Sequence, residues 1–117
     1  MQPENILLDD NGHVKLTDFG LSKWKASEDD RAITFCGTPE YLAPEMLLHR
    51  RHGGGYGREV DWWSLGIVCY EMLTGWPPFF DRDFERMCEK ILTKPLKIPP
   101  KYKFSPDAQT FIRGLLE

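Results

Sequence analysis

Two oxygen-bearing side chains in the first part of the sequence are suited to hold a magnesium ion. Asn5 offers an amide oxygen and Asp18 a carboxylate, and thirteen positions separate them. Mg²⁺ is a hard cation that prefers oxygen ligands of these kinds. Short apolar stretches around the turn sequence Asp9-Asp10-Asn11-Gly12 lie between the two residues, so a hairpin is expected to bring them together. The spacing therefore allows the two side chains to share one Mg²⁺ site.

The tripeptide Asp18-Phe19-Gly20 is a weak signal when it is taken alone. A turn after a strand is the more frequent explanation of such a tripeptide. Four segments taken together make the turn a poor explanation, because each segment occurs once and they follow one another in a fixed order. They are P-E-N from Pro3, D-F-G from Asp18, G-T-P-E-Y-L-A-P-E from Gly37 and D-W-W-S-L-G from Asp61. A chance arrangement of all four is not a serious competitor.

The elements that must position these residues are expected to be mainly helices. Residues 5–18 predict two short strands around a turn, and residues 18–45 show little periodicity, which is typical of a functional or disordered stretch. Helices are predicted over residues 41–49, 60–74 and 83–93, and a last one from Pro106, capped by Ser105. The fold class is therefore expected to be α+β and mainly helical.

The segment from Val60 to Thr74 has the strongest helical pattern. Its apolar side chains spread around most of the helix circumference, which predicts a buried helix. Gly75 is expected to end the helix, and Pro77-Pro78 prevents its continuation.

Composition bounds the remaining possibilities. The chain has 117 residues, enough for one domain, and its formal net charge of −3 gives no support for a nucleic-acid partner. No apolar run reaches transmembrane length, and the first twenty residues lack the layout of a signal peptide. Three cysteines without metal-ligand spacing suit a reducing compartment, so we expect an intracellular, cytoplasmic or nuclear location.

The ordered segments resemble one family. Nearly the whole chain resembles the C-terminal lobe of a serine/threonine protein kinase of the AGC class, in particular the Akt, SGK and ribosomal-protein kinase groups. Phe35–Glu45 and Asp61–Gly75 carry most of the resemblance. It implies that residues 1–117 are a partial kinase domain, from the end of the catalytic loop through the activation segment to about the penultimate helices, with a short hairpin and three to four helices. It also implies ATP and Mg²⁺ as cofactors and phosphoryl transfer to protein serine or threonine.

The resemblance gives roles to the residues that would handle the nucleotide. Asn5 and Asp18 match the two magnesium ligands of the family. Leu7, between Ile6 and Leu8, matches the centre of the apolar floor under the adenine ring, although a plain core strand explains these residues equally well. Phe19 matches the aromatic residue whose packing sets active and inactive states.

Other positions match residues that bind protein substrates. Glu4 and Glu71 match acidic residues that hold arginines upstream of the target, since guanidinium and carboxylate form paired hydrogen bonds. Two solvated surface acids are the simpler alternative. Phe35, Pro39 and Leu42 match the wall of the pocket for the residue that follows the target.

The remaining matches concern regulation and structure. Thr34 matches the activation-loop phosphosite, so an upstream activating kinase is expected, and Lys23 matches a partner of that phosphate. Glu45 and Asp61 match residues with structural roles, the first paired with an arginine and the second bound to the catalytic loop.

Several family features have no match within these residues. The catalytic aspartate would immediately precede Met1, and Gln2 stands where the family has a lysine. The glycine-rich loop, the ATP-anchoring lysine and the arginine partner of Glu45 are likewise not among the 117 residues. We therefore expect this chain alone to be inactive, to bind no nucleotide and to expose an apolar patch.

Two explanations of the chain stay open. Met1 could reflect an incomplete gene prediction for an active kinase, or the chain could be a non-catalytic binding module or an expressed remnant. An in-frame H-R-D or Y-R-D codon run just upstream of Met1 would support the first, and a stop codon there would support the second.

Overall fold

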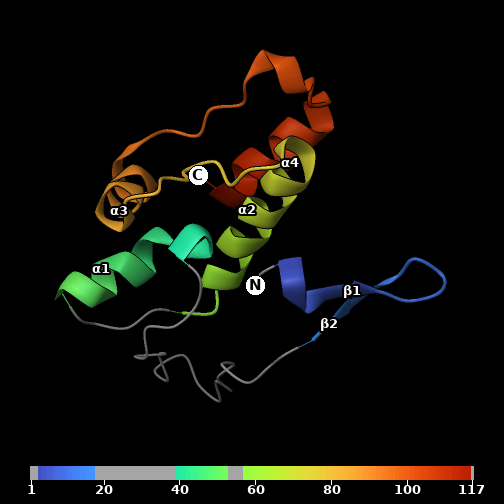
Figure 1. Ribbon diagram of the computed structural model, residues 1–117, viewed down its shortest axis with the longest axis horizontal. Coiled ribbons are helices and arrows are strands. Elements are labelled where there is room, and N and C mark those ends of the chain that lie inside the picture. The colour runs from blue at the N-terminus through green and yellow to red at the C-terminus, as the bar shows by residue number, and fades with distance from the viewer. Residues whose placement is uncertain (1–2, 18–38, 53–56, 117) are drawn as a thin grey trace.

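A computed structural model describes residues 3–17, 39–52 and 57–116 of the chain (Figure 1). These residues form a two-stranded hairpin, four α-helices and three short 3₁₀ turns. In chain order they are η1 (Pro3–Asn5), β1 (Ile6–Leu8), β2 (Val14–Leu16), η2 (Pro39–Tyr41), α1 (Pro44–His52), α2 (Val60–Thr74), α3 (Phe84–Thr93), η3 (Pro100–Tyr102) and α4 (Pro106–Leu116). The expectation of a mainly helical fold with one hairpin is confirmed.

The hairpin is antiparallel, with Leu8 opposite Val14, and Figure 1 shows it reaching outward from the helices. Its turn is closed by the side chain of Asp9, whose Oδ1 accepts hydrogen bonds from the backbone N–H groups of Asn11 at 2.9 Å and His13 at 2.8 Å. Gly12 adopts a φ of 81°, a left-handed conformation that glycine reaches without steric cost. The predicted turn chemistry therefore sets the register of the strands.

Helix α2 lies at the centre of the fold, and α4 packs along it (Figure 1). The close approach depends on Gly66, because a Cβ at this position would lie 2.9 Å from Leu115 Cβ and 2.8 Å from Leu116 Cδ2. Ile67 of α2 and Ile112 of α4 are almost fully buried. The core therefore begins at the α2–α4 contact.

The core continues from α2 to α1, α3 and the loops between them. Trp63 stacks on Phe79 with ring centroids 6.1 Å apart, and Tyr70 meets the edge of Phe104 at 5.8 Å. The Tyr70 hydroxyl also donates to the carbonyl of Lys97 at 2.9 Å, which ties the connector after α3 to α2. The buried cluster includes Leu42, Ala43, Met46, Leu47, Met87, Cys88, Ile91, Leu96 and Leu116.

The helix ends follow the predicted signals in most places. Gly75 ends α2 with a φ of 89°, and its N–H donates to the Glu71 carbonyl. Ser105 Oγ accepts a hydrogen bond from Ala108 N at 3.1 Å and caps α4 as predicted. Asp83 caps α3 by accepting from Glu85 N at 2.9 Å, so that helix begins one residue later than predicted.

The predicted helix over residues 41–49 differs from the observed one. Tyr41 closes the short turn η2, and α1 runs over Pro44–His52. The reason is local: a residue that precedes proline is disfavoured in the α conformation, so the helix cannot pass through Ala43 and starts at Pro44.

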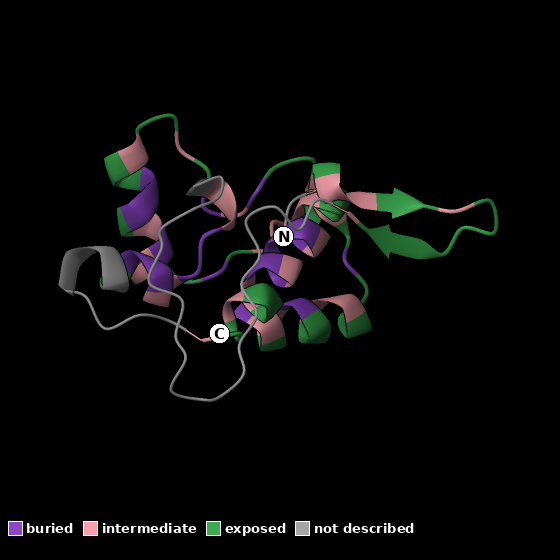
Figure 2. Cartoon of the chain, turned by 90° about the horizontal axis from the view of Figure 1, so that it is seen from below, coloured by how far each residue is buried: buried purple, intermediate pink, exposed green. Residues whose placement is uncertain are grey.

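Helix α2 is less buried than its composition predicted. Its inner face is covered, but Trp62, Met72 and Leu73 are exposed in the described part of the chain. Figure 2 shows buried and exposed residues alternating along the helices, with the hairpin almost wholly exposed. Among the described residues, no helix has the length and apolar character needed to cross a membrane.

Candidate functional site

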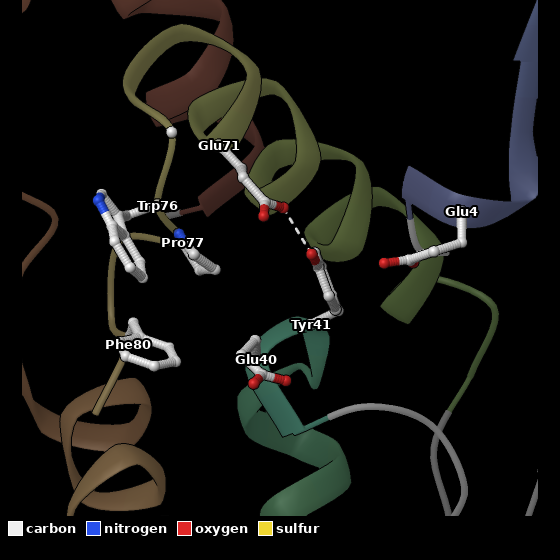
Figure 3. A pocket seen from close by; sticks show the side chains of 8 residues that line it. Glu4, Glu40, Tyr41, Glu71, Trp76, Pro77 and Phe80 are labelled. Carbon is white, nitrogen blue, oxygen red and sulfur yellow. Dashed lines mark hydrogen bonds between the residues drawn. The ribbon is translucent and has the colours of Figure 1, made fainter. Parts of the chain in front are cut away.

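A pocket of about 240 Å³ opens beside the C-terminal half of α2 (Figure 3). Four parts of the chain build it: η1, η2, α2 and the loop that follows α2. The lining residues are Glu4, Glu40, Tyr41, Glu71, Gly75, Trp76, Pro77 and Phe80. Three of these eight residues are glutamates, so the pocket is strongly acidic.

A hydrogen bond joins two walls of the pocket. The Tyr41 hydroxyl of η2 donates to Glu71 Oε2 of α2 at 2.5 Å (Figure 3). Burial raises the pKa of Tyr41, and so do the hydrogen bond to Glu71 and the negative charges of Glu71, Glu4 and Glu40. The phenol therefore stays protonated at physiological pH and keeps donating to Glu71.

Among the side chains that the structure describes, none forms an ion pair with these three glutamates. The described ion pairs involve Asp9, Asp81 and Asp83 instead. In addition, Glu40 Oε2 is buried and accepts no hydrogen bond from any described residue. A buried oxygen without a donor is costly, so the pocket is suited to a ligand that brings positive charge and several N–H groups.

The wall of the pocket that lies opposite Glu4 is aromatic. The rings of Trp76 and Phe80 lie 5.5 Å apart between centroids and are tilted by 44°. Figure 3 shows these two side chains on one side of the pocket and Glu4 on the other. A ligand in the pocket would therefore meet carboxylates and an aromatic surface together.

Glu4 and Glu71, the two glutamates singled out from the sequence, meet in this pocket although they are far apart in the chain. Sequence reasoning missed the roles of Glu40, Tyr41 and the aromatic pair. Glu40 and Tyr41 lie inside the G-T-P-E-Y-L-A-P-E segment, and that segment was a usable signal. For the aromatic pair, the signal in the sequence was two large aromatic residues close to Pro77-Pro78, Trp76 before the prolines and Phe80 after them.

The predicted magnesium ligands are described only in part. Thr17 N donates to the Asn5 carbonyl at 2.8 Å, so the hairpin brings Asn5 beside the residue that precedes Asp18. Asp18 itself lies outside the described residues, together with Phe19, Lys23, Thr34 and Phe35. In the described part of the chain, no group of three or more acidic, histidine or cysteine side chains is arranged to hold a metal.

The remaining predicted residues lie in several places. Leu7 is exposed and lies on the face of the hairpin opposite to Ile6 and Leu8, because successive side chains of a strand alternate. Leu42 is buried in the core, and Pro39 begins η2. The two residues with predicted structural roles each lie in the first turn of a helix. Glu45 lies in α1 and is half-buried, and Asp61 lies in α2 and is exposed.

Comparison with known proteins gives a consistent result. The family described as protein kinase domain matches residues 1–117. The chain is 54% identical over 116 residues to the serine/threonine-protein kinase YPK1 of Saccharomyces cerevisiae, covering 99% of the chain and 16% of that protein. It is 55% identical over 116 residues to protein kinase 2 of Dictyostelium discoideum, covering 99% of the chain and 23% of that protein. It is 51% identical over 117 residues to human serine/threonine-protein kinase Sgk1, covering 100% of the chain and 26% of that protein. The chain thus spans about a quarter or less of the length of these relatives.

Proposed function

The chain belongs to the protein kinase family, in its AGC class of serine/threonine kinases, and we propose that the acidic pocket receives an arginine side chain of a protein substrate. In this proposal the described residues are part of the C-terminal lobe of the kinase domain. The arginine lies upstream of the serine or threonine that accepts the phosphoryl group. Family membership supports a protein substrate, and the pocket supports a basic one.

One observation carries the proposal: Glu4, Glu40 and Glu71 converge on one pocket, and none of the side chains that the structure describes forms an ion pair with them. Like charges held together repel one another, so the arrangement is costly unless a cation occupies it. Two independent surface acids would not be expected to share a pocket. The guanidinium group of arginine carries five N–H donors in a fixed plane, which suits several carboxylates at once.

The hydrogen bond from Tyr41 makes the two carboxylate oxygens of Glu71 differ in function. Oε2 accepts from the Tyr41 hydroxyl, which holds the carboxylate in place. The other oxygen is left to accept from a ligand, as is the buried Oε2 of Glu40. A carboxylate that is already oriented loses less conformational freedom when it binds.

We also propose the cofactor roles that the family implies. Asn5 and Asp18 would hold Mg²⁺, which neutralises charge on the phosphates of ATP, and Leu7 would contact the adenine ring. The position of Asn5 at the open end of the hairpin, beside Thr17, supports its part. Thr34 as a phosphosite for an upstream kinase, with Lys23 as the partner of its phosphate, remains a prediction, as do an intracellular location and the substrate wall formed by Phe35, Pro39 and Leu42.

A peptide-binding experiment tests the arginine pocket. A fluorescent peptide with arginine upstream of serine should bind the purified chain more tightly than the same peptide with citrulline, which keeps the shape but lacks the charge. Glu71→Gln should weaken binding of the arginine peptide by about tenfold or more, because a charged hydrogen bond contributes about 1.5–3 kcal/mol. Fluorescence polarisation measures both affinities.

Glu89→Gln is the matched control, because it removes the same charge from an exposed position on α3 that does not line the pocket. Its affinity for the arginine peptide should equal that of the wild type. Equal binding of the arginine and citrulline peptides would refute the proposal.

In the same assay, adding MgATP should yield no phosphopeptide. None of the 117 residues matches the catalytic aspartate that orients the substrate hydroxyl in this family. Peptide binding without transfer would also suit the second candidate, a non-catalytic binding module. The observation in its favour is that none of the described residues that line the pocket is a predicted ligand of magnesium or of the nucleotide.

A further inference from the structure

We propose that Trp76, supported by Phe80, makes the acidic pocket selective for arginine over lysine. This inference rests on the proposed binding of a basic side chain in the pocket. It assigns the discrimination between the two basic residues to the aromatic wall and not to the glutamates.

The inference starts from the exposure and position of the aromatic pair. Trp76 is 61% exposed and Phe80 37%, yet both line a pocket that contains three glutamates. A single exposed aromatic residue needs no explanation. Here two adjacent rings, with centroids 5.5 Å apart and planes tilted by 44°, together form an aromatic wall at the place where a ligand would lie.

The chemistry of the two basic side chains decides which of them this surface favours. Carboxylates attract an ammonium and a guanidinium group alike. A guanidinium group is planar and weakly hydrated, so it stacks on an aromatic face while its edge donates to carboxylates. An ammonium group is compact and strongly hydrated, and it gains less from such a face. The aromatic wall therefore accounts for the difference in affinity between an arginine and a lysine side chain.

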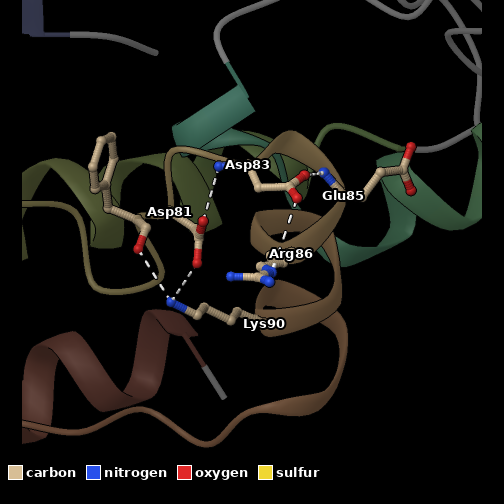
Figure 4. A network of polar contacts seen from close by, with 6 residues as sticks. Asp81, Asp83, Glu85, Arg86 and Lys90 are labelled. Atoms are coloured by element: carbon tan, nitrogen blue, oxygen red, sulfur yellow. Dashed lines mark hydrogen bonds and ion pairs between the residues drawn. The ribbon is translucent and has the colours of Figure 1, made fainter.

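The backbone that carries the two rings is held on both sides of Pro77-Pro78. Before the prolines, Trp76 N donates to Thr74 Oγ1 at 3.2 Å. After them, Lys90 Nζ lies 3.0 Å from Asp81 Oδ2 and donates to the Phe80 carbonyl at 3.4 Å (Figure 4).

Asp81 is itself fixed at the start of α3. Its Oδ1 accepts a hydrogen bond from Asp83 N at 2.8 Å, which Figure 4 shows beside the contact with Lys90. The loop is thus ordered before a ligand arrives, and binding costs little conformational entropy.

An apolar side chain from a partner is the competing occupant of this wall. The charges of the pocket argue against it, because an apolar group would exclude water from Glu4, Glu40 and Glu71 without offering them a partner. A guanidinium group suits both walls, because it donates hydrogen bonds to the carboxylates and stacks on the aromatic rings.

The test compares three peptides that differ at one position, arginine, lysine or phenylalanine, on the purified chain. Trp76→Leu should weaken binding of the arginine peptide about two- to fivefold and leave the lysine peptide nearly unchanged, so that the preference for arginine falls. Trp76→Phe should restore part of the preference, because it keeps an aromatic face.

Trp62→Leu is the matched control, since Trp62 is also 61% exposed and does not line the pocket. It should change neither affinity. An unchanged ratio of arginine to lysine affinity in Trp76→Leu would overturn the inference, as would tighter binding of the phenylalanine peptide. If arginine and citrulline peptides bind equally, the proposed function fails instead, which separates the two results.

Discussion

At the scale of single residues, the pocket is organised by a tyrosine among carboxylates. Tyr41 is held between the charges of Glu4, Glu40 and Glu71, and its hydroxyl donates to Glu71. Burial and these charges raise its pKa because both disfavour a phenolate. Tyr41 is therefore a permanent donor that orients Glu71, and its ionisation should be visible in the pH dependence of folding.

The first residue-scale prediction concerns alkaline pH. Below the ordinary pKa of 10.0, tyrosine is protonated in both folded and unfolded chains. Above it the unfolded chain loses the proton first, so the contribution of Tyr41 to stability is lost as the pH rises toward its raised folded pKa. Tyr41→Phe should therefore lose less unfolding free energy than the wild type between about pH 8 and about pH 11.

Urea unfolding of both proteins at these pH values measures the difference. Comparison at the lower pH gives the cost of the lost hydrogen bond to the Glu71 carboxylate, about 1.5–3 kcal/mol, separately from the titration. Tyr70, whose pKa is also raised by burial, is present in both proteins and so contributes equally. Parallel loss of stability in the two proteins would contradict the prediction.

At the scale of elements, the contact between α2 and α4 determines where the pocket can form. Gly66 lets α4 approach α2 so closely that Leu115 and Leu116 cover it. This contact fixes one side of α2, while Glu71 of the same helix lines the pocket. The position of Glu71 therefore depends on packing as well as on its own hydrogen bond.

Gly66→Ala should destabilise the chain by about 1–3 kcal/mol, the usual cost of overpacking. Leu116 Cδ2 could move aside, but Leu115 Cβ is attached to the backbone of α4, so the whole helix must shift. Chemical denaturation of the variant and the wild type measures the difference.

Gly114→Ala is the control, because nothing lies within 4 Å of a Cβ at that position of α4. It should stabilise the chain by about 0.5–1 kcal/mol through helix propensity alone. A neutral Gly66→Ala would show that α4 does not pack as tightly as the structure indicates.

At the scale of the whole molecule, apolar side chains are exposed in several regions of the described chain. The hairpin pairs Leu8 with Val14, and these side chains are 69% and 59% exposed. Leu16 lies on the same face two residues from Val14 and is also exposed. A short hairpin with an uncovered apolar face is prone to associate with other chains.

The chain should therefore self-associate at micromolar concentration and bind a hydrophobic dye. The double variant Leu8→Thr, Val14→Thr should reduce both effects, since threonine keeps the β propensity and removes the apolar face. Sedimentation velocity and dye fluorescence measure them. Leu48→Gln with Phe111→Gln, which removes exposed apolar groups from α1 and α4, should have a smaller effect; a monodisperse, dye-negative wild-type chain would refute the prediction.

The sequence by itself determined the elements, because their signals are local. The turn at Asp9–Gly12, the ends of α2 at Val60 and Gly75 and the Ser105 cap of α4 were all predictable, since each depends on neighbours within a few residues. The resemblance of short ordered segments was also enough to indicate the family and the pair Glu4 and Glu71.

Only the tertiary structure decided what surrounds that pair. Glu40, Tyr41, Trp76 and Phe80 come from separate segments, and no periodicity or cap relates them to Glu4. The exposed face of α2 was equally beyond local patterns, because burial depends on which elements pack against a helix and not only on its composition. Contacts between distant segments form a pocket only after the chain has folded, so the parts played by Glu40, Tyr41 and the aromatic pair could be read from the structure alone.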